Sequence, residues 1–165
     1  MTEKEKEKLR LLCELIKNSR KSDREIAKSL KISQPTVTRK RTMLEKEGYI
    51  KEYTVIPNLE KMNYEIIAVS FLSFSEAKPE LTEQAREWCE NQPSIIFATG
   101  GEGFGMHSMM VSIHENYASF SRLVTKLRED WQPNLKDLRS FLMSLGRKEL
   151  AYKPFSFRYL AETAK

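Results

Sequence analysis

Long apolar runs, cysteine and histidine are all scarce in this sequence, and each scarcity excludes a class of protein. No stretch of the 165 residues approaches the roughly 18–20 consecutive apolar residues of a membrane span. The first eight residues, MTEKEKEK, alternate in charge and contain no apolar core, so we expect no secretion signal. Cys13 and Cys89 have no CxxC spacing, and with two histidines they do not make a zinc-binding set. We therefore expect a cytoplasmic protein with two reduced, buried thiols, no metal and no cofactor.

Positive charge is concentrated in the first third of the chain. Residues 1–62 contain 16 Lys or Arg and 10 Asp or Glu, whereas residues 63–165 contain 12 and 13. A basic module followed by a nearly neutral one is typical of nucleic-acid-binding proteins. A basic segment of this kind can also contact an anionic membrane, but its narrow apolar stripes favour an internal core.

Three short helices are predicted in the basic module. Over residues 3–18, Leu9, Leu12, Cys13 and Ile16 have the spacing of one helix face. The stretch SDRE, residues 22–25, has the pattern of a capping box, and it precedes a helix with Ile26, Ala27 and Leu30 inward. After the turn at residues 31–33, Ser33 as N-cap and Pro35 in the first turn predict a third helix that ends near Gly48.

Two short helices joined by a tight turn make a helix-turn-helix, in which the second helix enters the major groove of DNA. Val37 and Leu44 mark the buried side of that helix; Thr38, Arg39 and Thr42 point away from it. Gln and Arg can bind base edges in pairs of hydrogen bonds, Thr offers a hydroxyl or a methyl, and Lys or Arg suits phosphates. We expect Gln34, Thr36, Thr38 and Arg39 to read bases, and Ser33, Lys40, Arg41 and Lys51 to contact phosphates.

After Gly48, the stretch YIKEYTVI alternates and is rich in β-forming residues, which predicts a β-strand wing containing Lys51. An alternative interpretation is a charged, solvated surface helix in which Arg41 pairs with Glu45 four residues on. Two capped helices followed by a wing favour DNA binding instead. Lys31 occupies a turn position at which glycine is frequent, and a left-handed conformation there is costly for lysine.

The second half of the chain has the order β-α-β-β-α-β, a ferredoxin-like arrangement. Strands are predicted over residues 64–74, 94–99, 106–114 and 138–145, with helices from Pro79 and over residues 117–130. The helices would turn two sets of residues inward: Leu81, Ala85, Trp88 and Cys89, and Phe120, Leu123, Val124 and Leu127. Because both helices would cover one sheet face while the first, second and last strands are apolar on both faces, the other face needs a cover. A second copy of the sheet is the favoured cover. The alternative is the C-terminal tail, whose aromatic residues are Tyr152, Phe155, Phe157 and Tyr159.

The sequence resembles the Lrp/AsnC, or feast/famine, family of transcription regulators over nearly its whole length. The resemblance depends on DREIAKSLKISQPTVTRKRTMLEKEGYIKEYTVIPNLEKMNY and, less specifically, on the β-α-β-β-α-β order with ATGGEGFGMHSMMVSI between the middle strands. It implies an α+β protein with a winged helix-turn-helix at residues 1–52, a hinge at 53–63, a βαββαβ domain of RAM or ACT type at 64–146, and a tail at 147–165. It also implies homodimers through the sheets, and in some members tetramers or octamers.

Many members of this family bind an amino-acid effector near the loop after the second strand. The usual aromatic–Asp pair is replaced here, because Gly105 stands where the family has Asp, and Glu102 is the nearest acidic group. Glycine N–H groups suit a carboxylate, and Glu102 would accept from an ammonium. A flexible hairpin explains the glycines equally well, and the run does not join a strand to a helix as a dinucleotide loop does. The candidate effector residues are Gly100, Gly101, Glu102, Gly103, Phe104 and His107, although a histidine at the position of His107 is more often a packed or rim residue.

The leading hypothesis is a sequence-specific regulator of double-stranded DNA. No Ser/His/Asp set, paired-carboxylate site or phosphate-binding loop is visible, so we predict that the protein is not an enzyme. Two alternatives stay open: an architectural protein that binds DNA without base readout, and an enzyme similar to siroheme decarboxylases on the same scaffold. The second would require histidine and basic residues in the C-terminal half, which is slightly acidic.

Overall fold

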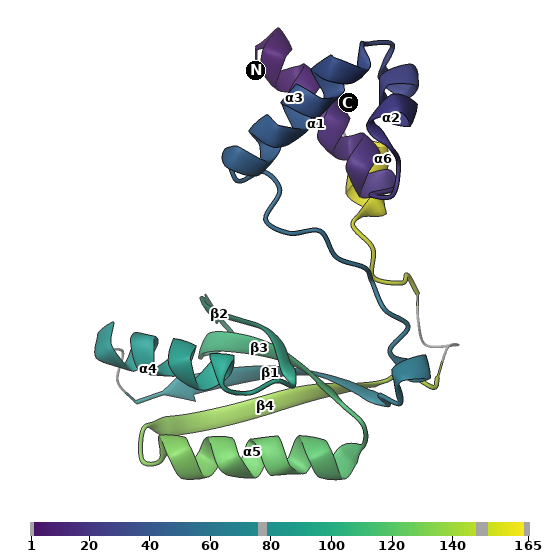
Figure 1. Ribbon diagram of the computed structural model, residues 1–165. Helices are drawn as coiled ribbons and strands as arrows, with labels where there is room; N and C mark the ends of the chain where they lie inside the picture. The colour runs from purple at the N-terminus through teal and green to yellow at the C-terminus, as the bar shows by residue number, and fades with distance from the viewer. Residues whose placement is uncertain (1, 76–78, 148–151, 164–165) are drawn as a thin grey trace. The chain divides into compact units, whose positions relative to one another are not determined.

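A computed structural model describes residues 2–75, 79–147 and 152–163. The chain forms two compact units, one of Met1–Pro57 with Lys153–Lys165 and one of Asn58–Tyr152 (Figure 1). The C-terminal segment therefore joins the N-terminal unit.

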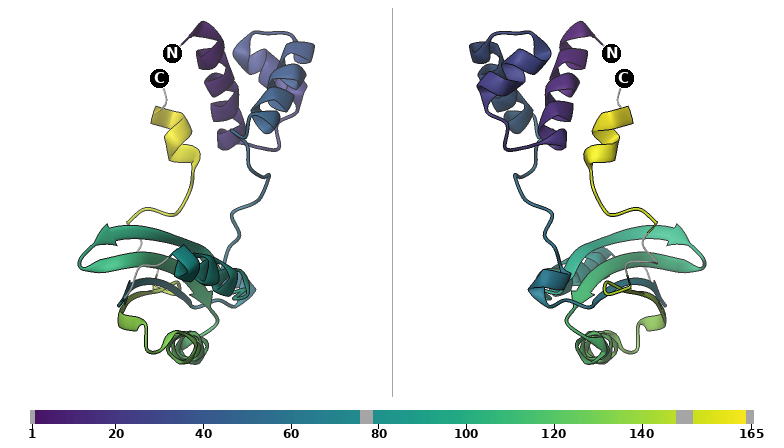
Figure 2. Two further views of the ribbon diagram at one scale, coloured as in Figure 1. Left: turned by 90° about the vertical axis from the view of Figure 1, so that its left-hand side faces the viewer. Right: turned by 90° about the vertical axis from the view of Figure 1, so that its right-hand side faces the viewer.

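The N-terminal unit is helical. It contains α1 (Glu3–Lys17), α2 (Asp23–Leu30) and α3 (Gln34–Lys46), and the short C-terminal helix α6 (Arg158–Thr163) packs against α1. Figure 2 shows α6 beside α1 in both views. The core of this unit consists of side chains from the first three helices, listed in chain order: Leu11, Leu15, Ile26, Ala27, Val37 and Leu44.

Side-chain caps begin these helices where the sequence predicts. Ser22 and Glu25 form the predicted capping box at α2, and the Ser33 hydroxyl accepts from the Thr36 N–H at the start of α3, with Pro35 in the first turn. Lys31 adopts the left-handed conformation, with φ 56° and ψ 42°. The backbone N–H of Ile32 bonds to the carbonyl of Ala27 across this turn, which compensates for the cost of that conformation in a lysine.

The buried stripe of α1 differs from the prediction. Leu11 and Leu15 are the buried residues, whereas Leu9, Leu12, Cys13 and Ile16 are half-buried. Six of the eight residues at positions 9–16 are apolar, so the sequence contains two overlapping helical stripes. Only the packing of the neighbouring helices decides which of the two becomes the core.

The predicted wing does not form a strand. Residues 50–57 are extended but lie in no β-ladder. An extended segment becomes a strand only when its N–H and C=O groups find a partner, and among the described residues none pairs with this one. Lys51 is exposed on this segment.

The second unit confirms the β-α-β-β-α-β order. It contains β1 (Ile66–Phe74), α4 (Pro79–Glu90), β2 (Ile95–Gly103), β3 (Met106–His114), α5 (Tyr117–Trp131) and β4 (Leu135–Ser144), after a 3-10 turn at Glu60–Met62. The strands form an antiparallel sheet in the order β2-β3-β1-β4. Figure 1 shows this sheet with α5 running along it.

Both helices cover the same face of the sheet, as predicted (Figure 2). The core between them contains Leu72, Met110, Leu123, Leu127 and Trp131. Leu81, Ala85 and Trp88 of α4 pack onto this cluster but are only half-buried. The predicted inward faces of the two helices are therefore confirmed.

Polar side chains are also buried between the helices and the sheet. Ser70, Ser112 and His114 are at most 2% exposed. His114 Nε2 lies 2.8 Å from Ser112 Oγ, and the imidazole packs edge-on against Phe120. Burial lowers the pKa of His114 below its ordinary value, because the apolar surroundings disfavour the charged ring.

This burial predicts that acid destabilises the second unit. Between pH 7.5 and 5.5 the unfolded chain takes up a proton at His114 more readily than the folded chain, so the free energy of unfolding should fall as the pH falls. Urea unfolding of His114→Gln should show a smaller fall over this range. Equal slopes in the wild type and in His114→Gln would contradict the prediction.

Candidate nucleic-acid interface

The orientation of α3 is set by two fully buried side chains. Val37 and Leu44 are 0% exposed and face the core. At about 100° per residue, Gln34, Thr38, Arg39 and Thr42 project outward, and all four are exposed. The outer face of α3 is therefore the polar surface that the sequence predicts.

Two side chains of this face have unengaged polar ends. Among the described residues, neither the Gln34 amide nor the Arg39 guanidinium has a hydrogen-bond or ion-pair partner. Both project from the N-terminal half of α3. The structure thus leaves free the two side chains that are best suited to paired hydrogen bonds with base edges.

The hydroxyl groups of α3 bond within the protein. Thr36 Oγ1 lies 2.7 Å from Ser33 Oγ, Thr38 Oγ1 donates to Asp23 Oδ2 at 2.6 Å, and Thr42 Oγ1 donates to the Thr38 carbonyl. A Thr hydroxyl has one proton and two lone pairs. Thr38 and Thr42 therefore keep only acceptor capacity toward a ligand.

Lys40 and Arg41 link α3 to the other helices rather than standing free. Lys40 pairs with Glu7 of α1, and only 11% of its side chain is exposed. Arg41 pairs with Asp23 of α2 at 2.7 Å and donates to the Lys21 carbonyl at 3.4 Å. We expected both side chains to be free for phosphates. In the structure, each of the two charges already has a partner inside the domain.

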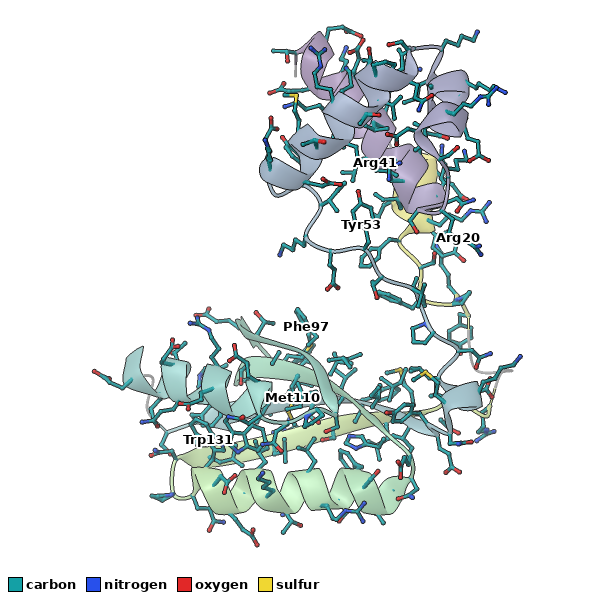
Figure 3. All side chains as sticks on the ribbon, in the orientation of Figure 1. Arg20, Arg41, Tyr53, Phe97, Met110 and Trp131 are labelled. Carbon is teal, nitrogen blue, oxygen red and sulfur yellow. The ribbon has the colours of Figure 1, made fainter. Side chains whose placement is uncertain are left out.

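The alternative pairing of Arg41 with Glu45 does not occur. Glu45 instead accepts a hydrogen bond of 2.8 Å from the Tyr53 hydroxyl, which joins the extended segment to α3. Figure 3 shows Tyr53 directed toward the part of α3 that carries Arg41. Burial, followed by the bond to Glu45, raises the pKa of Tyr53, against a smaller lowering by the Arg41 charge.

Sequence reasoning missed several exposed cations. Arg24 and Lys28 on α2, Lys31 in the turn and Lys46 at the end of α3 are exposed and form no ion pair in the described part of the chain. The signal was present, because the apolar residues that α2 turns inward are Ile26, Ala27 and Leu30, which leaves Arg24 and Lys28 on the outer side. These four cations are available to phosphates, together with Lys51.

The glycine-rich segment of the second unit is not a loop. Gly100, Gly101, Glu102 and Gly103 lie in β2, with an irregular register between Gly100 and Gly103. A two-residue turn at Phe104 and Gly105, with φ of 54° and 72°, connects β2 to β3. Positive φ at both central residues is what a tight hairpin requires, and it is strained for phenylalanine.

The candidate effector residues form no closed site within one chain. Glu102 and His107 are exposed, and among the described residues their side chains bond to no other group. The Phe104 ring is 87% exposed, and it lies in a T-shaped arrangement with the Phe71 ring at a centroid distance of 6.3 Å. The structure therefore gives these residues no enclosure.

The sheet face opposite the helices is apolar and open. In register across the strands lie Val69, Val111, Phe97 and Phe141, and Phe97 and Phe141 are 51% and 66% exposed. Figure 3 labels Phe97 on this sheet. The alternative cover, the C-terminal tail, instead contributes α6 to the N-terminal unit, and Tyr152 is 99% exposed.

Within residues 2–75, 79–147 and 152–163, no group of His, Cys, Asp and Glu could hold a metal ion, and no helix is both long and apolar enough to span a bilayer. Cys13 and Cys89 are free thiols. Both are half-buried, whereas the sequence predicts that they are buried.

These features define a protein with a helix-turn-helix DNA-binding domain and a βαββαβ domain. The family described as winged helix-turn-helix DNA-binding matches residues 8–51. The HTH-type transcriptional regulator LrpC of Bacillus subtilis is 33% identical over 89 residues, which cover 54% of this chain and 60% of LrpC. An uncharacterized HTH-type transcriptional regulator of Pyrococcus furiosus is 44% identical over 64 residues, which cover 39% of this chain and 43% of that protein. The chain thus spans about two-fifths to three-fifths of the length of the curated relatives it matches.

Solved structures share the fold over nearly the whole chain. A transcriptional regulator of Neisseria meningitidis, in complex with L-Met, superposes with a TM-score of 0.78 at 17% identity and covers 92% of both chains. An AsnC family transcriptional regulator of Agrobacterium tumefaciens superposes with a TM-score of 0.77 at 13% identity and covers 91% and 92%. Together with the sequence matches, this shared fold supports the resemblance to the Lrp/AsnC family of transcription regulators.

The partnered state of Lys40 predicts a structural effect of its removal. Lys40→Met should lower the urea midpoint of the N-terminal unit, because it leaves Glu7 without the bond that lowers the Glu7 pKa. Lys46→Met removes an exposed, unpaired cation of the same helix and should leave the midpoint unchanged. Equal urea midpoints for the two variants would contradict a stabilising role of the Lys40–Glu7 pair.

Proposed function

We propose that the protein is a sequence-specific regulator of transcription that binds double-stranded DNA as a dimer. The observation that carries this proposal is the outer face of α3, where Gln34 and Arg39 are exposed without partners. The match to a DNA-binding domain and the naming of the curated relatives as transcriptional regulators support it.

In this proposal α3 enters the major groove with its N-terminal half first. Arg39 would bind a guanine through O6 and N7, and Gln34 would bind an adenine through N6 and N7. Thr36 and Thr38 would contact neighbouring bases, while the Ser33 region, Arg24, Lys28, Lys31, Lys46 and Lys51 would contact phosphates. Lys40 and Arg41 would act indirectly by holding α3 in position.

A second copy of the chain would cover the open sheet face. An exposed apolar face of this extent is unusual in a monomer, and a two-fold partner offers the same apolar face in return. The dimer would bring two recognition helices to one pseudo-palindromic site, whose half-sites are about one helical turn apart. Such dimers would in turn assemble into tetramers or octamers.

A small amino-acid-like effector would bind at the β2–β3 hairpin. Glu102 is the acceptor there for an ammonium group, and the irregular register of β2 leaves glycine backbone groups available for a carboxylate. The Neisseria regulator of the same fold was solved with L-Met, which makes methionine a suitable first probe. Since one chain does not enclose these residues, a neighbouring copy would complete the site.

Removal of Arg39 should reduce discrimination between sequences. In competition binding, Arg39→Ala should lower the ratio of specific to random-duplex affinity by about tenfold, because it removes a paired contact to a base. Arg24→Ala should weaken both duplexes alike and reduce the salt dependence by about one unit of slope. Selection from a random library that returns no motif would favour an architectural protein, and failure to retard any duplex would reject DNA binding.

A charge on the open sheet face should separate the proposed dimer. Phe141→Glu places an unpaired carboxylate in the apolar patch, so sedimentation should show a monomer or a dissociation constant raised by at least tenfold. Tyr117→Glu is the matched control, since Tyr117 is 64% exposed on α5 of the opposite layer. A Phe141→Glu protein that stays as dimeric as the control would rule out this interface.

A further inference from the structure

The Thr38 hydroxyl on the outer face of α3 has an unusual hydrogen-bond environment. Thr38 is exposed, and Oγ1 lies 2.6 Å from Asp23 Oδ2 and 3.2 Å from the backbone carbonyl of Gln34. Both neighbours are oxygen atoms that can only accept. The single hydroxyl proton is therefore consumed within the protein, whichever neighbour receives it.

Asp23 is held in place for this role by a second contact. Its other oxygen, Oδ1, pairs with Arg41 Nη2 at 2.7 Å, and 20% of the Asp23 side chain is exposed. A carboxylate that faces a guanidinium on one side has no proton to give to Thr38 on the other. Asp23 is the first residue of α2 and contacts Thr38 and Arg41 of α3, so the packing of the two helices holds the carboxylate beside the hydroxyl.

We propose that Asp23 is a specificity-determining residue that fixes Thr38 as a hydrogen-bond acceptor toward DNA. In the major groove the donors are the N6 amino group of adenine and the N4 amino group of cytosine, whereas guanine and the thymine O4 present only acceptors. The position that faces Thr38 is thus read as adenine or cytosine. This inference rests on the proposed function, because it concerns how the same helix face selects its site.

The other hydroxyl of this face follows the same pattern. Thr42 donates to the Thr38 carbonyl at 3.2 Å, so its oxygen is also left as an acceptor. Donors on this face of α3 come instead from Arg39 and the amide of Gln34. The division between donors and acceptors along α3 is therefore created by contacts inside the domain.

Replacement of Asp23 by asparagine tests the direction of the bond. Arg41 needs an acceptor, so the amide oxygen of Asp23→Asn should face Arg41 and the NH₂ group should face Thr38. Thr38 then accepts from the amide, and the Gln34 carbonyl at 3.2 Å is left as the acceptor for its proton within the protein. Because the amide occupies one of the two acceptor positions of the Thr38 oxygen, the preference for adenine or cytosine should weaken at this one position.

The experiment is a binding-site selection from random duplexes with the full chain, followed by competition binding on the selected site. For the wild type, replacement of the preferred base should weaken binding about fivefold, as expected for one hydrogen bond. Thr38→Val, which has the same shape without the hydroxyl, should discriminate less than twofold at that position. Thr38→Ser keeps the hydroxyl and should retain the wild-type preference, and thermal unfolding checks that all variants are folded.

The possible outcomes separate this inference from the proposed function. If the wild type selects a motif and Thr38→Val selects the same motif with undiminished preference at every position, Thr38 reads no base and the inference is wrong. A preference lost in Thr38→Val but fully retained in a folded Asp23→Asn protein also overturns the role of Asp23. In both cases the proposed function stands, whereas a wild type that selects no motif overturns both.

Discussion

The burial of Val37 and Leu44 is the constraint on which the proposed interface depends. These two side chains, seven positions apart and both inaccessible to solvent, set the rotation of α3 about its own axis. Once that rotation is set, the helical period determines which residues face outward. A rotation by one residue would bury part of the polar face and expose the core, so the hydrophobic contacts of α1 and α2 orient the groups proposed to contact DNA.

Some polar residues around α3 are held in ion pairs within the domain, whereas others are free to contact a ligand. Lys40 and Arg41 belong to the helix that the charge pattern marks as DNA-binding, yet their partners Glu7 and Asp23 commit them to the domain itself. Arg39 directly precedes Lys40 in sequence but remains free because it points outward. Asp23 contributes to both groups, since it neutralises Arg41 and also orients the hydroxyl of Thr38. The proposed readout of bases by this domain would therefore depend on its internal hydrogen bonds.

In the second unit, one face of the sheet is covered by helices and the other face is exposed. Its helices bury Leu72 and Met110 together with the polar pair of Ser112 and His114, whereas Phe97 and Phe141 lie open on the other side. The hairpin at Phe104 adds an exposed ring in a strained backbone conformation. Strain and apolar exposure in the same region are costs that a partner surface would offset.

Much of the fold follows from short-range sequence rules. The helix starts follow from the capping residues Ser22 and Ser33. The inward faces follow from the spacing of Val37 and Leu44 and from the alternation of the strands, because backbone geometry fixes the helix and strand periods. The outward position of Gln34, Thr38 and Arg39 follows from the same period.

Only the tertiary structure decided features that depend on residues far apart in the chain. Which residue lies nearest in space decides three such features: the core stripe of α1, the ion pairs Lys40–Glu7 and Arg41–Asp23, and the packing of α6 on α1. The same holds for residues 50–57, which have the composition of a strand but pair with no strand in the part of the chain that the structure describes. The sequence by itself determined the local elements and their faces, whereas three-dimensional proximity determined which charges and hydroxyls remained free to meet a ligand.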